Sequence, residues 1–291
     1  MSKNRRRSFI SLFLLMCIAT TRGQNTTQLN QPQTPFRIFG NTYYVGTHGL
    51  SSVLITSPAG HVLIDGDLPE SASQIAGNIK ALGFRLEDVK LIVNSHVHFD
   101  HAGGIAELQR RSGAKVVASA WSAEVLKNGG VGHGDPQSKT LAPIAPVKDV
   151  SEFRDGESLH VGDTTLTPHL TPGHTPGGTS WTWQACEGTV CHNMVYADSL
   201  NPISSPGFKF SGKRDYPNAL ADFERSFAFF ETTPCDVLIT AHPELSSLWD
   251  RLASREKGAK PDPMVDPGAC RRYAENGREK LRQRLAAESG Q

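Results

Sequence analysis

The chain has 291 residues, of which 38% are hydrophobic and 20% are charged, and its formal net charge at pH 7 is +1. This is an ordinary globular composition, with enough apolar residues for one large domain or two small ones. No dense basic patch with interleaved aromatic residues occurs, which argues against nucleic acid as the main partner.

The first 23 residues predict an exported protein. A basic start is followed by an apolar run from Phe9 to Ala19 and by small residues at Thr21 and Gly23. This is the pattern of a secretory signal peptide, and the run is too short for a convincing membrane span. The basic start leaves Sec and twin-arginine export both open. Removal of this segment takes away five of the 30 basic residues against 29 acidic ones, so the mature chain carries a formal charge of −4. We expect that mature chain to be a periplasmic monomer with no stable membrane association.

The rest of the chain combines strand and helix signals. Polar residues 24–35 predict a flexible lead-in, and residues 36–291 are expected to form one domain. Apolar alternation predicts strands, and apolar spacings of three or four predict helices. The expected elements, in chain order, are strands over 42–46, 52–56 and 62–65, a helix over 70–82, a strand over 89–93, a helix over 104–111, a strand over 116–118, a helix over 120–127, strands over 158–161, 165–170, 179–184 and 194–197, a helix over 218–231, a strand over 236–240 and a helix after Pro267. This order fits two sheets packed face to face with helices outside.

A long segment rich in glycine and proline covers residues 129–147. Loops of this length in compact domains are often functional. We expect His133, within it, to approach a substrate, and the other histidines outside the motifs below to be ordinary surface or buried residues.

Four side chains of metal-ligand type follow the predicted strand 89–93. They are His96, His98, Asp100 and His101. Imidazole nitrogen suits Zn²⁺, and a carboxylate oxygen adds to a mixed nitrogen and oxygen site. Three histidines and an aspartate within six positions indicate a metal site rather than a solvated polar turn.

Two further histidines stand at strand ends. His174 lies in a turn bounded by glycine and proline, and His242 follows the predicted strand 236–240. Six ligands are too many for one tetrahedral zinc, but they fit two metals that each have three protein ligands and room for water. Paired metals of this kind are a known device for hydrolysis. Asp65 and Asp67, at another strand end, are candidates to orient the imidazoles, although ordinary turn chemistry explains them equally well.

The cysteine count gains meaning from export. Without Cys17, four cysteines remain for an oxidising compartment. Cys186 and Cys191 flank a turn between two predicted strands, whereas Cys235 and Cys270 would tie a late strand to the C-terminal helix. Four cysteines allow three pairings, so the connectivity stays open here, and zinc binding is the alternative, with a spacing that does not match a structural zinc site.

At these residues the chain resembles the metallo-β-lactamase superfamily, and more closely its subclass B3. The motifs that carry the resemblance span about residues 36–285 and are Ser95-His96-Val97-His98-Phe99-Asp100-His101-Ala102-Gly103-Gly104, Thr171 to Trp181, Tyr196-Ala197-Asp198-Ser199-Leu200 and Pro234 to Leu238. The resemblance implies an α+β fold, an αββα sandwich of two mixed β-sheets with helices on both outer faces, as a single catalytic domain.

The resemblance also implies two Zn²⁺ ions and their ligands. The first zinc would be held by His96, His98 and His174, and the second by Asp100, His101 and His242. Ser199 stands where other subclasses carry a cysteine ligand, and the resemblance gives it a role in binding the substrate carboxylate, with Asn201 beside it. The usual disulfide of the family matches Cys235–Cys270, whereas a Cys186–Cys191 pair is not general in the subclass.

The activity implied is hydrolysis of the β-lactam amide bond of penicillins, cephalosporins and carbapenems by a metal-bound hydroxide, which confers β-lactam resistance. Asp100 would help to orient that nucleophile. No activated serine is required, and the Ser-x-x-Lys signature of serine β-lactamases is not evident.

Two other functions stay open at this level. A thioesterase or lactonase of the same fold would bridge its metals with an aspartate, and Asp198 is only one position from Ser199. A secreted zinc-binding protein without catalysis is the third possibility, since a storage site needs no open coordination position.

Overall fold

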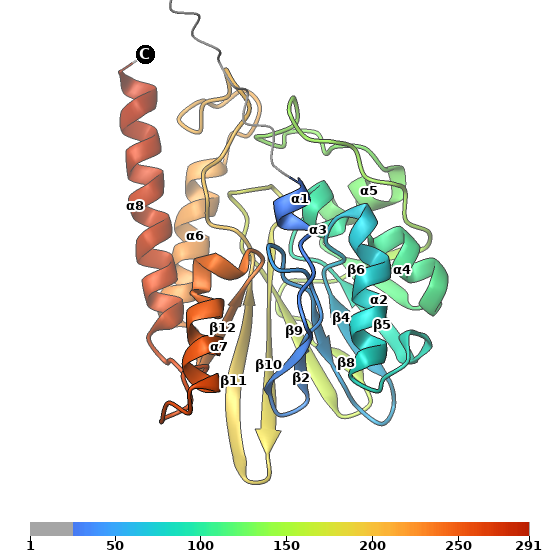
Figure 1. The fold of residues 1–291 in the computed structure, drawn as a ribbon. Helices are drawn as coiled ribbons and strands as arrows, with labels where there is room; N and C mark the ends of the chain where they lie inside the picture. The colour runs from blue at the N-terminus through green and yellow to red at the C-terminus, as the bar shows by residue number, and fades with distance from the viewer. Residues whose placement is uncertain (1–25, 291) are drawn as a thin grey trace, which may run out of the picture.

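Two mixed β-sheets form the centre of the computed structural model, which describes residues 26–290 (Figure 1). The predicted signal peptide over residues 1–23 lies outside the described residues. The first sheet has the strand order β1 (Phe36–Phe39), β2 (Thr42–Tyr44), β3 (Val53–Ile55), β4 (His61–Ile64), β5 (Val89–Val93), β6 (Lys115–Ala118) and β7 (Val150–Glu152). The second has the order β12 (Val237–Thr240), β11 (Val190–Ala197), β10 (Thr179–Glu187), β9 (Thr164–Leu170) and β8 (Leu159–Val161). The first is antiparallel from β1 to β4 and parallel from β4 to β7, and in the second only β11 and β12 are parallel.

Helices cover the outer face of each sheet (Figure 1). The helices are α1 (Thr26–Leu29), α2 (Ala72–Ala81), α3 (Phe99–Ala102), α4 (Ile105–Ser112), α5 (Ala120–Asn128), α6 (Ala219–Thr232), α7 (Leu248–Glu256) and α8 (Ala269–Ser289), with short 3₁₀ turns at Pro69–Ser71, Leu86–Asp88 and Pro243–Ser246. Helices α2, α4 and α5 pack on the first sheet, and α6 and α8 pack on the second. The predicted αββα sandwich is confirmed.

Alternation along the strands explains the layers. In β4, Leu63 points to the helices on the outer face, whereas Val62 and Ile64 point to the second sheet. Successive side chains of a strand face opposite sides, so an all-apolar strand fills two core layers at once. Trp181 on β10 is completely buried between the sheets. The strands are therefore held on both faces, which gives their ends fixed positions.

The predicted elements agree with the structure except at short segments. The strand over 89–93 is found at its predicted bounds, and the predicted helix over 70–82 is a 3₁₀ turn followed by α2. Strands β1 and β7 and helices α1, α3 and α7 were not predicted, because each is short or lacks a clear apolar period. Part of the predicted flexible lead-in is ordered by contacts, since Leu29 O accepts hydrogen bonds from Thr47 Oγ1 (2.6 Å) and Gly49 N (3.2 Å).

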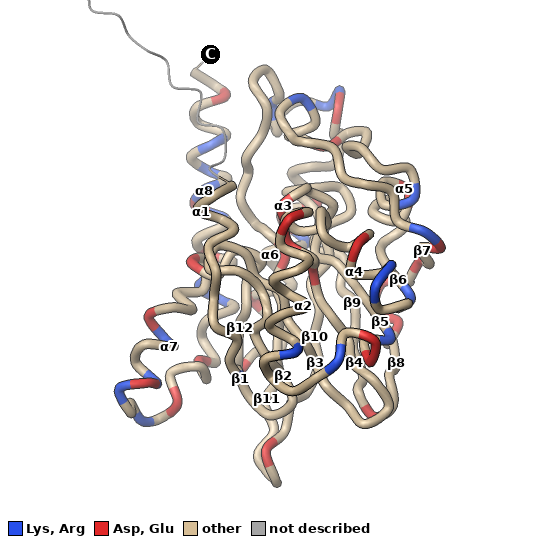
Figure 2. Tube along the Cα trace, turned by 45° about the vertical axis from the view of Figure 1, so that its right-hand side comes forward, with Lys and Arg blue, Asp and Glu red and all other residues tan. Residues whose placement is uncertain are grey.

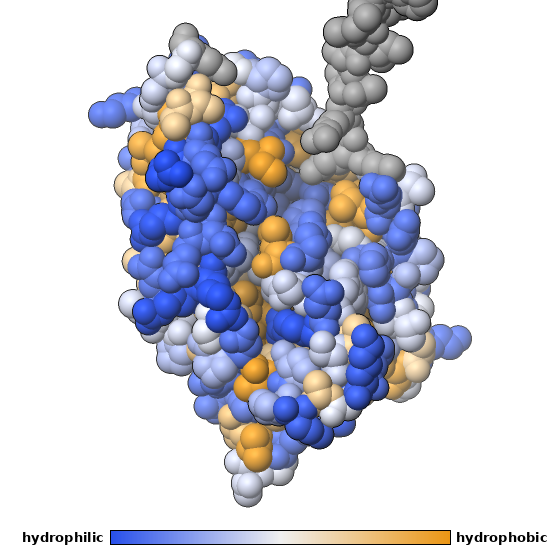
Figure 3. All heavy atoms as spheres, turned by 60° about the vertical axis from the view of Figure 1, so that its left-hand side comes forward, coloured by the Kyte–Doolittle hydropathy of each residue, from blue (hydrophilic) through white to orange (hydrophobic). Residues whose placement is uncertain are grey.

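Charged residues lie mainly on helices and loops, while most strand residues are uncharged (Figure 2). The face seen in Figure 3 is largely hydrophilic, with apolar residues in small separate patches. Among residues 26–290, no helix combines the length and the apolar character needed to span a membrane.

Candidate metal centre

The six predicted ligands come from the ends of strands in both sheets. His96 and His98 follow β5, Asp100 and His101 lie on the short helix α3, and His174 lies in the turn between β9 and β10. The sixth ligand, His242, follows β12. The packing of the two sheets brings these strand ends together. All six side chains are buried except that of His242, which is 19% exposed.

The ligands form two groups. One is His96, His98 and His174, and the other is Asp100, His101 and His242; in each group the potential ligand atoms lie within 4.8 Å of one another. The structure therefore brings together the two sets that the resemblance implied.

Distances within the second group are short. His101 Nε2 lies 3.2 Å from His242 Nε2, and Asp100 Oδ2 lies 3.5 Å and 3.6 Å from these two nitrogens. Two imidazole nitrogens and a carboxylate oxygen converge on one point, which is the donor set of a mixed nitrogen and oxygen metal site.

Unpartnered polar atoms also fit metal binding. His96 Nε2 and Asp100 Oδ1 are buried and have no hydrogen-bond partner among the described residues. Buried polar atoms nearly always have a partner, so such atoms need an explanation. A metal ion at the first group would satisfy His96 Nε2, and a water molecule held at the centre would satisfy Asp100 Oδ1, so the residues present fit the metals that the resemblance implies.

The pKa values favour the protonation states that metal ligands need. Burial lowers the pKa of His101 to about 3 and that of His174 to about 4, and it lowers the pKa of His96 well below its usual value. Burial alone would raise the pKa of Asp100, but the neighbouring imidazoles, first that of His101, lower it overall. The affected imidazoles are therefore neutral and the carboxylate is ionised, as coordination requires.

Each imidazole of the first group is oriented through its other nitrogen. Asp198 Oδ1 accepts a hydrogen bond of 2.7 Å from His96 Nδ1, and the backbone oxygen of Asn201 accepts one of 2.7 Å from His174 Nδ1. Asp135 Oδ2 lies 2.9 Å from His98 Nε2. These bonds select the tautomers and leave His96 Nε2, His98 Nδ1 and His174 Nε2 for a metal.

Asp65 supports the ligands in a different way from Asp198. It accepts hydrogen bonds from Ser95 N (2.6 Å), Ser95 Oγ (2.7 Å) and the Tyr196 hydroxyl (2.8 Å), and its Oδ2 lies 3.8 Å from His101 Nδ1. Burial raises the pKa of Asp65 to about 7, against the effect of the Ser95 hydrogen bonds. Through its hydrogen bonds to Ser95, the Asp65 carboxyl group holds the backbone directly before His96 in place.

Asp67 contacts a neighbouring loop. Its Oδ2 accepts a hydrogen bond of 3.2 Å from Thr47 N, and burial raises its pKa well above the usual value. Asp65 and Asp67 both have positive φ, of 62° and 53°, as aspartates in tight turns can. Asp65 therefore contacts the segment of the ligands directly, whereas the carboxyl group of Asp67 is hydrogen-bonded to the loop that contains Thr47.

The two predicted substrate-binding residues lie beside the first group. Ser199 follows Asp198 and is buried, and its Oγ accepts a hydrogen bond of 3.3 Å from Asn201 N. The side chain of Asn201 turns to α8, where its Oδ1 accepts a hydrogen bond of 2.6 Å from Lys280 Nζ. The serine thus lies next to the candidate metal centre, and the side chain of Asn201 is hydrogen-bonded to the ammonium group of Lys280.

Sequence reasoning missed two residues of the long loop. Asp135 orients His98, and Gln137 Nε2 lies 3.5 Å from both His98 Nδ1 and His174 Nε2. The loop itself was predicted to be functional, but no spacing singled out these positions. His133, the residue expected to approach a substrate, is exposed, and its backbone oxygen accepts a hydrogen bond of 3.1 Å from Trp121 Nε1.

The cysteines pair in one of the three possible ways. Disulfides join Cys186 to Cys191 at the end of the β10–β11 hairpin and Cys235 to Cys270 at the start of α8. The pairing that the resemblance implied for α8 and the hairpin pairing are both confirmed, and none of these cysteines is available to bind zinc.

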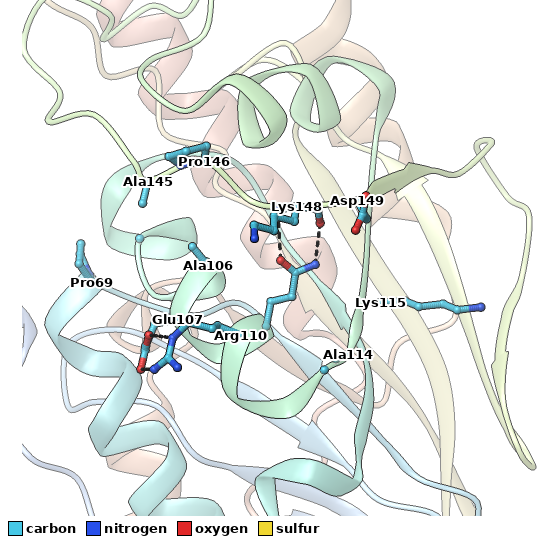
Figure 4. Close-up of a pocket in the computed structure, with 13 residues that line it drawn as sticks. Pro69, Ala106, Glu107, Arg110, Ala114, Lys115, Ala145, Pro146, Lys148 and Asp149 are labelled. Atoms are coloured by element: carbon cyan, nitrogen blue, oxygen red, sulfur yellow. Dashed lines mark hydrogen bonds and ion pairs between the residues drawn. The ribbon is translucent and has the colours of Figure 1, made fainter.

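A separate surface pocket lies on the outer side of α4 (Figure 4). Its volume is about 760 Å³, and Ala106, Glu107 and Arg110 line it together with residues 145, 146, 148 and 149. Glu107 and Arg110 pair with each other across the helix surface. None of the six candidate ligands lines this pocket, so it is not part of the candidate metal centre.

A known family matches about half of this chain, and solved structures match most of it. Residues 45–189 match the family model described as the metallo-beta-lactamase superfamily. The Rm3 metallo-beta-lactamase is 59% identical with a TM-score of 0.89, and the alignment covers 92% of this chain and 99% of that one. MEM-A1, a subclass B3 metallo-beta-lactamase from a soil metagenome library, is 52% identical with a TM-score of 0.87 and coverages of 90% and 99%.

Curated relatives match over a shorter part. The N-acyl homoserine lactonase AttM of Agrobacterium fabrum is 32% identical over 150 residues, which are 44% of this chain and 57% of that protein. A hydroxyacylglutathione hydrolase of Bradyrhizobium sp. is 31% identical over 145 residues, with coverages of 50% and 47%. The chain thus spans about half the length of the curated relatives it matches.

Proposed function

The chain belongs to the metallo-β-lactamase superfamily, and on that premise we propose that it is a zinc-dependent enzyme that hydrolyses the amide bond of β-lactams. Penicillins, cephalosporins and carbapenems are the proposed substrates, and β-lactam resistance is the proposed consequence. The observation that carries the proposal is the convergence of two three-ligand groups at the ends of both sheets.

We propose one Zn²⁺ at each group. His96, His98 and His174 would hold the first ion, and Asp100, His101 and His242 the second. When bound, such ions supply a Lewis acid for the substrate carbonyl and lower the pKa of coordinated water towards neutrality.

Asp100 has a second role in this proposal. Its Oδ2 faces His101 and His242, whereas its buried Oδ1 has no partner among the described residues. A free carboxylate oxygen accepts a hydrogen bond from a water molecule readily, so Asp100 Oδ1 is suited to orient the attacking water and to take its proton. Geometry and charge both support this role, because the pKa of Asp100 is lowered and its carboxylate is therefore ionised at neutral pH.

Ser199 and Asn201 are proposed to bind the substrate carboxylate. Ser199 offers a hydroxyl beside the first group, and Lys280 Nζ lies 2.6 Å from Asn201 Oδ1. A cation next to these polar groups favours an anionic substrate group over a neutral one. This end of the site would then orient the lactam ring over the metals.

Asp198 weighs against a lactonase or thioesterase that bridges its metals with an aspartate. Its Oδ1 is hydrogen-bonded to His96 Nδ1, the nitrogen on the opposite side of the ring from the free Nε2. A carboxylate at Nδ1 lies on the side of the ring away from the proposed metal, whereas a bridging ligand would lie on the metal side, near Nε2. Ser199, at the next position, has a neutral hydroxyl rather than the negatively charged carboxylate that would bridge two metal ions.

Export is part of the same proposal. We propose that residues 1–23 are a signal peptide and that the mature chain, with residues 36–291 as its catalytic domain, acts in the periplasm as a monomer without stable membrane association. Two disulfides support an oxidising compartment. Mass spectrometry of the periplasmic protein would test the cleavage site, and a full-length cytoplasmic product would contradict it.

Hydrolysis of a carbapenem by the mature chain tests the function directly. We expect loss of carbapenem absorbance, abolition of that activity by a chelator and its return on addition of Zn²⁺. An N-acyl homoserine lactone and a glutathione thioester serve as comparison substrates. Faster turnover of either one, or carbapenem hydrolysis that survives complete metal removal, would overturn the proposal.

A further inference from the structure

The orientation of His98 depends on a loop that has almost no regular structure. Asp135 lies in the segment 129–147, and its Oδ2 is 2.9 Å from His98 Nε2. Its Oδ1 accepts a hydrogen bond of 2.7 Å from Gln137 N, so the carboxylate is tied to the local turn, and it is only 2% exposed. Any change in this part of the loop is therefore transmitted to an imidazole of the first ligand group.

A second loop holds this turn from the other side. Ser205, which is only 3% exposed, donates its backbone N–H to Pro136 O at 2.9 Å. Its Oγ accepts a hydrogen bond of 3.2 Å from Lys139 N and lies 3.0 Å from Thr140 Oγ1. These contacts join positions about 65 residues apart, and they begin one residue after Asp135.

The two loops are not in contact along their whole length. A cavity of about 500 Å³ lies between the two loops, lined by residues 131–136, 138–139, 205, 208, 214 and 215. Beside this cavity, the hydrogen bonds of Ser205 to Pro136, Lys139 and Thr140 link the two loops near Asp135. At the far end of the turn, Trp121 holds His133 O, so that end is fixed independently.

Ser205 is itself held in place by the C-terminal helix. Arg284 donates hydrogen bonds to Ser204 Oγ (2.7 Å) and Phe208 O (2.8 Å), on both sides of Ser205. Glu288, which is 6% exposed, accepts a hydrogen bond of 2.7 Å from Arg284 Nε. The serine is therefore a rigid point rather than a mobile one.

We propose that Ser205 is a positioning residue that clasps the 129–147 loop and thereby keeps Asp135 hydrogen-bonded to His98. This inference rests on the proposed metal-binding role of His98. Ser205 follows Ser199 and Asn201 in the chain, but its buried hydroxyl is committed to the neighbouring loop. Its effect on catalysis is thus indirect, through the stability of the first metal site.

The test compares Ser205→Ala with Ser138→Ala in the zinc-loaded mature protein. Ser138 is a matched control, because it lies in the same loop and its exposed hydroxyl makes no hydrogen bond to another described residue. The measurement is the rate at which each zinc equivalent passes to a chromophoric chelator. Loss of two neutral hydrogen bonds predicts first-site release at least about fivefold faster in Ser205→Ala, with the second site and the Ser138→Ala variant unchanged.

A double-variant cycle separates positioning from general weakening. If Ser205 acts through Asp135, then Ser205→Ala adds little to the effect of Asp135→Ala, because the bond that it protects is already absent. The spectrum of the Co²⁺-substituted protein should change at the first site in both single variants. Additive effects, or release from Ser205→Ala that equals release from Ser138→Ala, would overturn the inference. Failure of the unaltered protein to bind zinc would instead overturn the proposed function.

Discussion

The hydrogen bond between Asp198 and His96 provides the sharpest test of how the centre is organised. The two atoms are 2.7 Å apart, and the side chains are 0% and 1% exposed. Asp198→Ala removes the carboxylate acceptor of the buried His96 Nδ1–H group and leaves only Ser95 Oγ, at the longer distance of 3.2 Å, beside it. We expect weaker binding of the first metal, while the second metal is unaffected because Asp198 makes no hydrogen bond to Asp100, His101 or His242.

The size of the effect follows from the burial of this pair. A buried donor that loses its partner costs about 1–3 kcal/mol. At about 1.4 kcal/mol for each factor of ten, this corresponds to roughly 5- to 150-fold. Loss of an orienting partner of a metal-bound histidine typically costs about 10- to 100-fold in affinity, so we expect a reduction within that range.

Competition against a chelator of known affinity, resolved for each zinc equivalent, measures the effect. Asp198→Asn keeps an acceptor oxygen and should retain more first-site affinity than the alanine variant, while circular dichroism checks that both are folded. Equal weakening of both sites would refute this reasoning, because that is the behaviour of a bridging ligand. It would favour the lactonase or thioesterase alternative.

Three further perturbations test the ligand sets, their protonation and the anchoring of α8. His101→Ala should remove the second zinc and leave the first site partly occupied, and retention of two full equivalents would contradict the assignment. In the metal-free protein, NMR signals of His101 and His174 should stay those of neutral imidazole from pH 8 to about pH 5, since burial lowers their pKa values to about 3 and about 4. Both pKa values lie below the value of about 6.5 that histidine has in an unfolded chain. As the pH falls below about 6.5, the unfolded chain therefore binds protons before the folded protein does, and the free energy of unfolding decreases. A titration midpoint near 6.5 for either histidine in the folded protein would be inconsistent with a buried site. Replacement of Cys235 and Cys270 by serine removes a disulfide that links residues 35 positions apart. We expect the free energy of unfolding to fall by about 4 kcal/mol, which urea denaturation measures. A fall below about 1 kcal/mol would show that packing alone anchors α8.

The first four ligands were predictable because local structure alone brings them together. His96, His98, Asp100 and His101 occupy six positions after an apolar strand, so any fold that buries β5 collects them at its end. His174 and His242 were recognisable as rigid or strand-end histidines. Their separation into two groups of three came from the family resemblance.

The residues that hold the ligands in place were harder to predict. Asp135 is 37 positions from His98, and Ser205 is about 65 from the loop that it clasps. Such contacts have no period and no characteristic spacing, because they depend on where two irregular loops end in space. Asp65 and Asp67 show the same limit, since one lies 3.8 Å from His101 Nδ1 and the other belongs to a turn.

By itself, the sequence determined which chemistry is present: strand-end ligands for two metals, an export pattern and cysteines for an oxidising compartment. Periodicity and adjacency encode these features, and both are properties of the chain read in order. The tertiary structure decided which distant groups share a site, including the convergence of β5, β9 and β12 at one end and the clasp at Ser205. The physical reason is that burial between two sheets determines which strand ends meet, and side-chain hydrogen bonds across irregular loops then determine how each imidazole is turned.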